Sequence, residues 1–120
     1  MVHITSHILN SLTGRSAVGV RSELIYRPAH GSSVTLFDTV TDEEGRISEI
    51  IDHHHFPPGL VPECELVFHG AKYFAAQGVA AAESSPVQVV VIRVVMEELN
   101  KRYHLPVMLS PHSYSLWWSQ

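Results

Sequence analysis

Short runs of apolar residues, separated by Gly, Pro, Asp and Ser, recur along the whole chain. This pattern is typical of an all-β sandwich or barrel, because each run is long enough for a strand and too short for most helices. Strands are predicted at residues 3–9, 18–26, 34–40, 64–68, 87–95, 103–110 and 114–118, with a further strand opening at Arg46. Seven or eight strands favour a two-sheet sandwich, since each sheet must bury one apolar face.

Three local features refine this pattern. Residues 41–47 resemble a hairpin turn in which Gly45 supplies a positive φ, so that Arg46 begins the next strand. Residues 71–77 are rich in alanine and are followed by Gly78, which predicts one short helix with a glycine C-cap. Pro106 has no N–H, so its strand must lie at an edge or lack one ladder hydrogen bond. We expect residues 1–120 to form a single domain, because no repeat or linker divides them.

Composition and charge exclude several classes of function. The net charge is −4 with histidine neutral, and the longest cationic run is the pair Lys101 and Arg102, which argues against a nucleic-acid partner. Residues 87–96 hold about half of the ~20 residues that a membrane helix needs, and they include Gln88 and Arg93. No targeting signal is recognised, so we expect a soluble, cytoplasmic protein without a membrane partner. The lone Cys64 agrees with a reducing compartment and is interpreted as a small buried residue.

Histidine is unusually frequent, with nine residues. Asp52 precedes three consecutive histidines, residues 53–55, which invites a metal interpretation. Adjacent residues rarely all reach one ion, and the sequence places no third and fourth ligand, so we expect a solvated loop and no metal. No Gly-x-Ser-x-Gly elbow and no phosphate-binding glycine loop is present. The remaining candidates for chemistry are the dispersed residues His7, Arg46 and His104.

His7 and His104 lie on predicted strands, so each presents an imidazole from a rigid element. Two imidazoles that converge on one water can hold it, remove its proton and return that proton to a leaving nitrogen near neutral pH. An arginine beside them can stabilise charge that develops on a carbonyl oxygen and can bind a planar heterocycle. Spacing alone does not show that the three residues meet, and a histidine on a strand is more often an ordinary strand residue than a catalyst.

Four blocks of sequence, taken in order, carry a family resemblance. They are Ser-His-Ile-Leu-Asn at 6–10, Thr-Asp-x-x-Gly-Arg at 41–46, Gly-Ala-Lys-Tyr-Phe at 70–74, and Tyr-His-Leu-Pro-Val-Met-Leu-Ser-Pro at 103–111 followed by Tyr-Ser at 114–115. The chain thereby resembles the transthyretin-like family, and its 5-hydroxyisourate hydrolase branch more than transthyretin itself. The resemblance implies a two-sheet sandwich of seven or eight strands with one short helix. It also implies a homotetramer with active sites in a channel between dimers.

The resemblance assigns roles to the three dispersed residues. His7 and His104 match the family's two catalytic histidines, and Arg46 matches its substrate-binding arginine. Because transthyretin has no histidine at the position of His104, the complete set favours a hydrolase over a hormone carrier. The implied reaction is cofactor-free attack of water on a ring amide of 5-hydroxyisourate, a purine-derived heterocycle on the path from urate to allantoin.

The departures from the family pattern leave the substrate open. Family hydrolases end in Tyr-Arg-Gly-Ser, whereas this chain ends in Trp-Trp-Ser-Gln, and Trp117, Trp118 and Gln120 are predicted to contact the substrate. Indole rings there would add stacking surface and remove a cation, or they would pack at the tetramer interface. Arg102 stands where the family has histidine, and His69 where it has threonine. Two alternatives remain: an enzyme acting on another lactam in a specialised pathway, and a non-catalytic carrier of an aromatic ligand.

Overall fold

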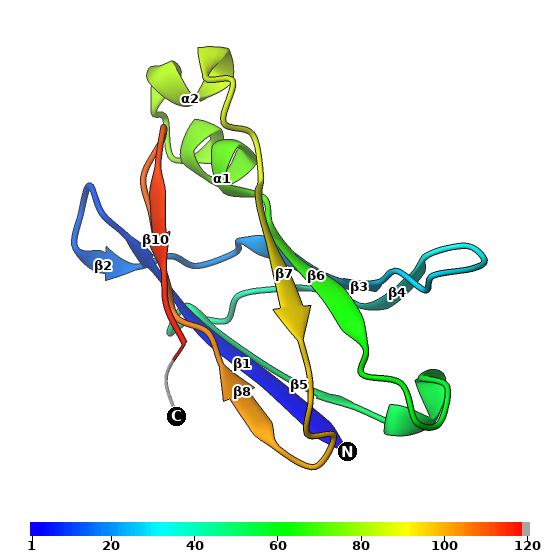
Figure 1. The fold of residues 1–120 in the computed structure, drawn as a ribbon. Helices are drawn as coiled ribbons and strands as arrows, with labels where there is room; N and C mark the ends of the chain where they lie inside the picture. The colour runs from blue at the N-terminus through cyan, green and yellow to red at the C-terminus, as the bar shows by residue number, and fades with distance from the viewer. Residues whose placement is uncertain (119–120) are drawn as a thin grey trace.

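Two β-sheets form the body of the molecule (Figure 1) in a computed structural model that describes residues 1–118. The larger sheet contains six strand segments: β1 (Val2–Asn10), β2 (Arg15–Ser16), β5 (Arg46–Ile51), β8 (Arg102–His104), β9 (Val107–Leu109) and β10 (Tyr114–Leu116). The smaller sheet has the order β4-β3-β6-β7, formed by β4 (Val34–Val40), β3 (Arg21–Tyr26), β6 (Glu63–Phe68) and β7 (Val90–Val95). The expected two-sheet, mostly-β sandwich is confirmed.

Helical structure lies mainly between β6 and β7. The helix α1 (Gly70–Ala76) matches the predicted one, and Gly78 follows it with a φ of 82°. A second segment, α2 (Ala80–Ser84), was not predicted, and in Figure 1 both helices lie at one end of the sandwich. The 3₁₀ turn η1 (His53–His55) follows β5. Within residues 1–118, none of these helices has the length and apolar content to span a membrane.

Alternation along β1 separates the core from the outer face of the larger sheet. Val2, Ile4 and Ile8 are fully buried in the core between the sheets, whereas His3 and His7 point to the other side and are half-buried. This period of two follows from the pleat of a strand. Burying each large apolar side chain contributes roughly 1.5–3 kcal/mol, so the core fixes which face of β1 turns outward.

β1 is paired along both of its edges. It runs antiparallel to β5 on one edge and parallel to β8 and then β9 on the other. Pro106 falls between β8 and β9 and divides the single strand predicted for residues 103–110, as its missing N–H requires. The Leu105 N–H still donates to the Thr5 carbonyl at 2.9 Å, and the Ser6 hydroxyl donates to the Leu105 carbonyl at 2.5 Å. The two halves of the divided strand therefore keep one register along β1.

The predicted hairpin at residues 41–47 is wrong in its pairing, although the positive φ of Gly45 is confirmed at 74°. The flanking strands β4 and β5 belong to different sheets, so the turn carries the chain from one sheet to the other. A Cβ atom on Gly45 would lie 2.7 Å from the Ile8 carbonyl oxygen and 2.8 Å from the Ser16 Cβ. The turn is packed against β1 and β2, and this packing replaces the hairpin ladder.

We expect Gly45→Ala to destabilise the fold by more than ~2 kcal/mol, since the left-handed backbone disfavours alanine by about 1–2 kcal/mol and the added methyl overlaps β1. Gly14→Ala is the matched control, because Gly14 has a φ of 72° and no atom within 4 Å of an added Cβ. Urea unfolding of both variants separates the two contributions. Equal losses would show that the close approach to β1 does not matter.

Candidate functional site

Strand register brings His7, Arg46 and His104 to one face of the larger sheet. His7 on β1 is directly opposite Arg46 on β5, and Thr5 on β1 is directly opposite His104 on β8. Positions two apart on a strand share a face, so Thr5 and His7 project to the same side. Across the antiparallel β1–β5 pair, directly opposite residues such as His7 and Arg46 have Cβ atoms about 4.5–5.5 Å apart. The three residues are therefore neighbours on the outer face, away from the core.

His104 is held through Thr5. The Nδ1 atom of His104 lies 2.8 Å from the Thr5 hydroxyl oxygen, and the Arg102 Nε–H donates to the same oxygen at 3.1 Å. Thr5 is only 6% exposed, so its hydroxyl depends on these partners. Partial burial, followed by the charges of Arg102, Arg46 and His7, lowers the pKa of His104 from the ordinary 6.5. The lowered pKa favours the neutral form of this imidazole.

His7 and Arg46 have looser surroundings. The Nε2 atom of His7 lies 3.1 Å from the Ser16 hydroxyl oxygen, and the ring is half-buried. The Arg46 guanidinium is about half exposed, with its Nε 4.0 Å from a carboxylate oxygen of Glu44. Such a long, solvated ion pair holds a side chain weakly, so the guanidinium can turn toward a ligand. The backbone of Arg46 is fixed instead, because its N–H donates to the Asp42 carboxylate at 2.9 Å.

The two tryptophans face opposite sides of the larger sheet. The Trp117 N–H donates to the Pro106 carbonyl at 3.2 Å, which extends the β9–β10 pairing by one position. Trp117 thus lies two positions beyond Ser115, on the outer face with His7 and His104, and is 45% exposed. Trp118 instead lines a cavity of about 370 Å³ with Tyr103 and Lys101, whose ammonium lies 5.4 Å from the Trp118 ring centre. Gln120 lies outside the described residues.

Thr5 and Arg102 were not predicted as site residues. Arg102 was noted only as a departure from the family, and Thr5 was not singled out. The signal that could have found Thr5 is the strand period, which places it on the same face as His7. Its bond to His104 joins residues 99 positions apart, and no local pattern reports such a pairing.

The other polar candidates take no part in this face. The Asp52 carboxylate accepts from the His54 backbone N–H at 3.1 Å and lies 2.7 Å from the His54 ring, so it caps the η1 turn. Within residues 1–118, no three His, Cys, Asp or Glu side chains gather as they would around a metal ion. Cys64 is buried, and this burial raises the pKa of its thiol to about 12, so it is no nucleophile at neutral pH.

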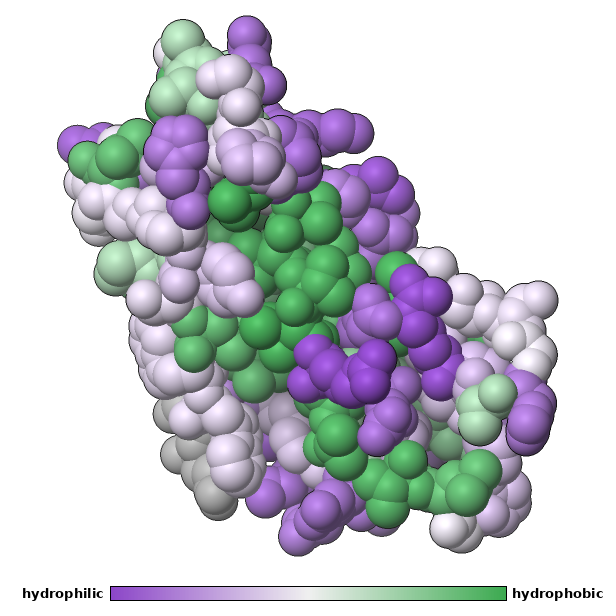
Figure 2. Space-filling view, turned by 45° about the horizontal axis from the view of Figure 1, so that its top comes forward, coloured by the Kyte–Doolittle hydropathy of each residue, from purple (hydrophilic) through white to green (hydrophobic). Residues whose placement is uncertain are grey.

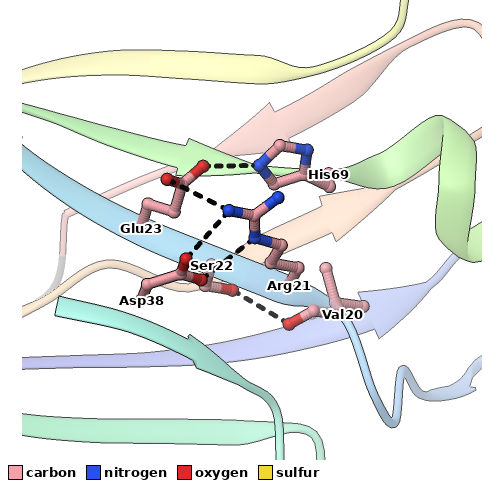
Figure 3. Close-up of polar contacts among 6 residues, drawn as sticks. All are labelled: Val20, Arg21, Ser22, Glu23, Asp38 and His69. Carbon is pink, nitrogen blue, oxygen red and sulfur yellow. Dashed lines mark hydrogen bonds and ion pairs between the residues drawn. The ribbon is translucent and has the colours of Figure 1, made fainter. Parts of the chain in front are cut away.

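A second polar cluster lies on the smaller sheet (Figure 3). His69 Nε2 is 2.6 Å from a Glu23 carboxylate oxygen, and both side chains are only 15% exposed. Arg21 donates two hydrogen bonds to Asp38, at 3.0 and 2.8 Å, and lies 3.6 Å from Glu23. The Arg21 guanidinium holds the pKa of Asp38 below its usual value. The charges of this cluster are paired with one another, so it joins β3, β4 and the start of α1 without leaving a cation free for a ligand.

We expect Asp42→Ala to destabilise the fold at neutral pH, because the carboxylate accepts the N–H groups of Arg46 and Glu44, both at 2.9 Å. These two bonds lower the pKa of Asp42 below 3.8 in the folded state. The stabilisation is therefore present above the unfolded pKa and disappears as the pH falls through the folded value. Urea unfolding between pH 7 and pH 3 should show wild type and variant converging at low pH. Asp42→Asn, which keeps an acceptor oxygen, is the control, and a difference that does not change with pH would contradict the assignment.

Comparisons with known proteins match this fold. A family model described as the HIUase/Transthyretin family matches residues 4–118. A 5-hydroxyisourate hydrolase of Pseudomonas aeruginosa is 32% identical over 116 residues, which cover 96% of this chain and 89% of that protein. Among solved structures, the 5-hydroxyisourate hydrolase of Klebsiella pneumoniae aligns over 100% of both chains with a TM-score of 0.77 and 26% identity. Sea bream transthyretin in complex with thyroxine aligns over 97% of this chain and 93% of its own, with a TM-score of 0.79 and 25% identity.

Proposed function

This chain belongs to the HIUase/transthyretin family, and we propose that it is a cofactor-free hydrolase that opens a cyclic amide of a purine-derived heterocycle, with 5-hydroxyisourate as the substrate. The observation that carries the proposal is the placement of His7, Arg46 and His104 on one sheet face. The relatives named 5-hydroxyisourate hydrolase support the choice of substrate.

The proposed reaction uses the three side chains directly. An imidazole takes a proton from water while the water oxygen attacks the ring carbonyl carbon. The Arg46 guanidinium stabilises the negative charge that builds on the carbonyl oxygen. The ring C–N bond then breaks, and the proton returns to the leaving nitrogen, so that neither a metal nor an organic cofactor is required.

Trp117 is proposed to stack on the flat ring of the substrate, since it lies on the same face and is largely exposed. Trp118 lines the cavity beside Tyr103 and Lys101, so its predicted contact with the substrate belongs to the proposal through the family pattern alone. A contact between substrate and Gln120 belongs to the proposal through the family pattern alone. The tail is thus expected to set which heterocycle binds, while the two histidines and Arg46 carry out the reaction.

Self-association as a homotetramer is part of the proposal. A catalytic group on an open sheet face is surrounded by water, and a second subunit would exclude much of that water. Figure 2 shows a broad band of hydrophobic side chains across one side of the molecule, and Val91 and Val95 on the edge strand β7 are 44% and 45% exposed. An apolar edge of this kind is typical of a surface that pairs with another chain.

The substrate test generates 5-hydroxyisourate from urate and uricase in the cuvette and follows its ultraviolet absorbance. We expect decay well above the spontaneous rate, and we expect His7→Ala and His104→Ala each to lower kcat by ~10²–10⁴-fold. Both variants should keep the wild-type mass in solution, four times that of the chain. Decay at the spontaneous rate by folded tetramer would exclude this substrate, and full activity in both variants would exclude the site. An aromatic ligand recovered unchanged at stoichiometric occupancy would favour the carrier alternative.

Trp117→Ala is expected to raise KM by about two- to tenfold, because stacking on an aromatic ring contributes ~0.5–1.5 kcal/mol beyond the area it buries. Trp117→Tyr should retain most of the affinity, since it keeps an aromatic face. Trp118→Ala is the comparison, and its KM should change less. Equal KM increases for Trp117→Ala and Trp118→Ala would show that the face assignment does not govern substrate binding.

A further inference from the structure

We infer that Thr5 and Arg102 are positioning residues that hold His104 as a neutral imidazole with its proton on Nε2. On this arrangement His104 is a fixed hydrogen-bond donor, and His7 alone carries the proton during the reaction. The inference rests on the proposed function for the roles of the two histidines. The state of the His104 ring itself can be measured without any substrate.

The direction of the hydrogen bonds follows from what each group can donate. Arginine has no acceptor, so the Arg102 Nε–H must donate to the Thr5 oxygen, at 3.1 Å. The Thr5 hydroxyl is buried and needs an acceptor for its own hydrogen. Among residues 1–118, its remaining side-chain partner is His104 Nδ1, at 2.8 Å. The hydroxyl therefore donates to Nδ1, which leaves the proton of the neutral ring on Nε2.

The charges around His104 oppose a second proton. Arg102 faces it from β8, Arg46 from β5, and His7 from β1, where His3 also lies opposite Arg102. Protonation would place an imidazolium beside two guanidinium groups and would reverse the bond from Thr5. The lowered pKa of His104, caused first by burial and then by these charges, agrees with this reading. His104 is thus held in one protonation state and one tautomer.

His7 lacks this restriction. Its Nε2 contacts the Ser16 hydroxyl at 3.1 Å, and a serine hydroxyl can rotate to donate or to accept. His7 can therefore keep its partner with or without a second ring proton, whereas a proton on His104 Nδ1 would leave the buried Thr5 hydroxyl without its acceptor. The two imidazoles have different hydrogen-bond partners, and these partners divide their roles.

With the roles of the two histidines divided in this way, every proton in the reaction is accounted for. The water proton moves to His7 as the new C–O bond forms, and His104 Nε2–H and Arg46 donate to the developing oxyanion. His7 then returns the same proton to the ring nitrogen as the C–N bond breaks. His104 begins and ends the cycle with its proton on Nε2, so no further proton acceptor is needed.

The first experiment records long-range ¹H–¹⁵N correlation spectra of the full protein labelled with [¹⁵N]histidine, across a pH titration. Wild-type His104 is expected as the Nε2–H tautomer, with a titration midpoint below 6.5. Thr5→Val, which replaces the hydroxyl with a methyl group, should give mixed tautomers and about a tenfold lower kcat, and Thr5→Ser should restore both. Thr35→Val, on an exposed position of β4, is the matched control for the substitution. A wild-type Nδ1–H tautomer, or an unchanged tautomer in Thr5→Val, would overturn the inference.

The second experiment compares glutamine at the two histidine positions, because its amide N–H can replace an Nε2–H donor but cannot act as a base. His104→Gln should keep about a tenth of the wild-type kcat, while His7→Gln should lose ~10²–10⁴-fold. Arg102→Met should raise the His104 titration midpoint, and Arg102→Lys should raise it less. Equal losses in both glutamine variants would overturn the division of roles. If 5-hydroxyisourate decays only at its spontaneous rate while His104 still shows the Nε2–H tautomer, the proposed function fails and the positioning by Thr5 stands.

Discussion

The pairing of β1 along both of its edges decides where every residue of the candidate site lies. One edge sets Arg46 opposite His7, and the other sets His104 opposite Thr5. A slip of one residue in either register would turn the partner strand's outer side chains toward the core, because side chains alternate with a period of two. The buried residues Ile47 on β5 and Tyr103 on β8 resist such a slip, since it would put polar or charged neighbours in their places. The same apolar packing that stabilises the sandwich therefore aligns the polar face.

This pairing fixes the backbone of the site, but the side chains of the site are held to different degrees. The turn before β5 is fixed by the contact of Gly45 with β1 and by the Asp42 carboxylate, so the Arg46 backbone cannot move without disturbing the core strand. Its guanidinium remains about half exposed and able to adapt to a ligand. His104 is the opposite case, since a buried threonine and an arginine constrain its ring. A hydrogen-bond donor that is held in place like His104 favours transition-state stabilisation, because it needs no reorganisation during the reaction.

The sequence predicted the elements better than their pairing. Alternation and β-branched residues located the strands, and the glycine after residues 71–77 correctly marked the end of α1. The motif blocks identified His7, Arg46 and His104, and the register then placed them on one face. The local sequence of residues 41–47 could not show whether the flanking strands form a hairpin, because their pairing depends on which sheet each strand joins. The opposite placement of Trp117 and Trp118 was not predicted, because it depends on how the chain continues past the end of β10 at Leu116.

The charge of the face has a consequence for what it can bind. The chain carries a net charge of −4, yet Arg46 and Arg102 lie on this face beside two imidazoles. The acidic neighbour is Glu44, whose carboxylate oxygen lies 4.0 Å from the Arg46 Nε. Local positive potential on an acidic protein attracts anionic ligands and concentrates them at the cationic site. The arginine at position 102, where the family pattern has histidine, keeps its own charge across the physiological pH range. The same cation adds to burial in disfavouring imidazolium at His104, so one arginine both strengthens the positive potential of this face and supports the neutral ring.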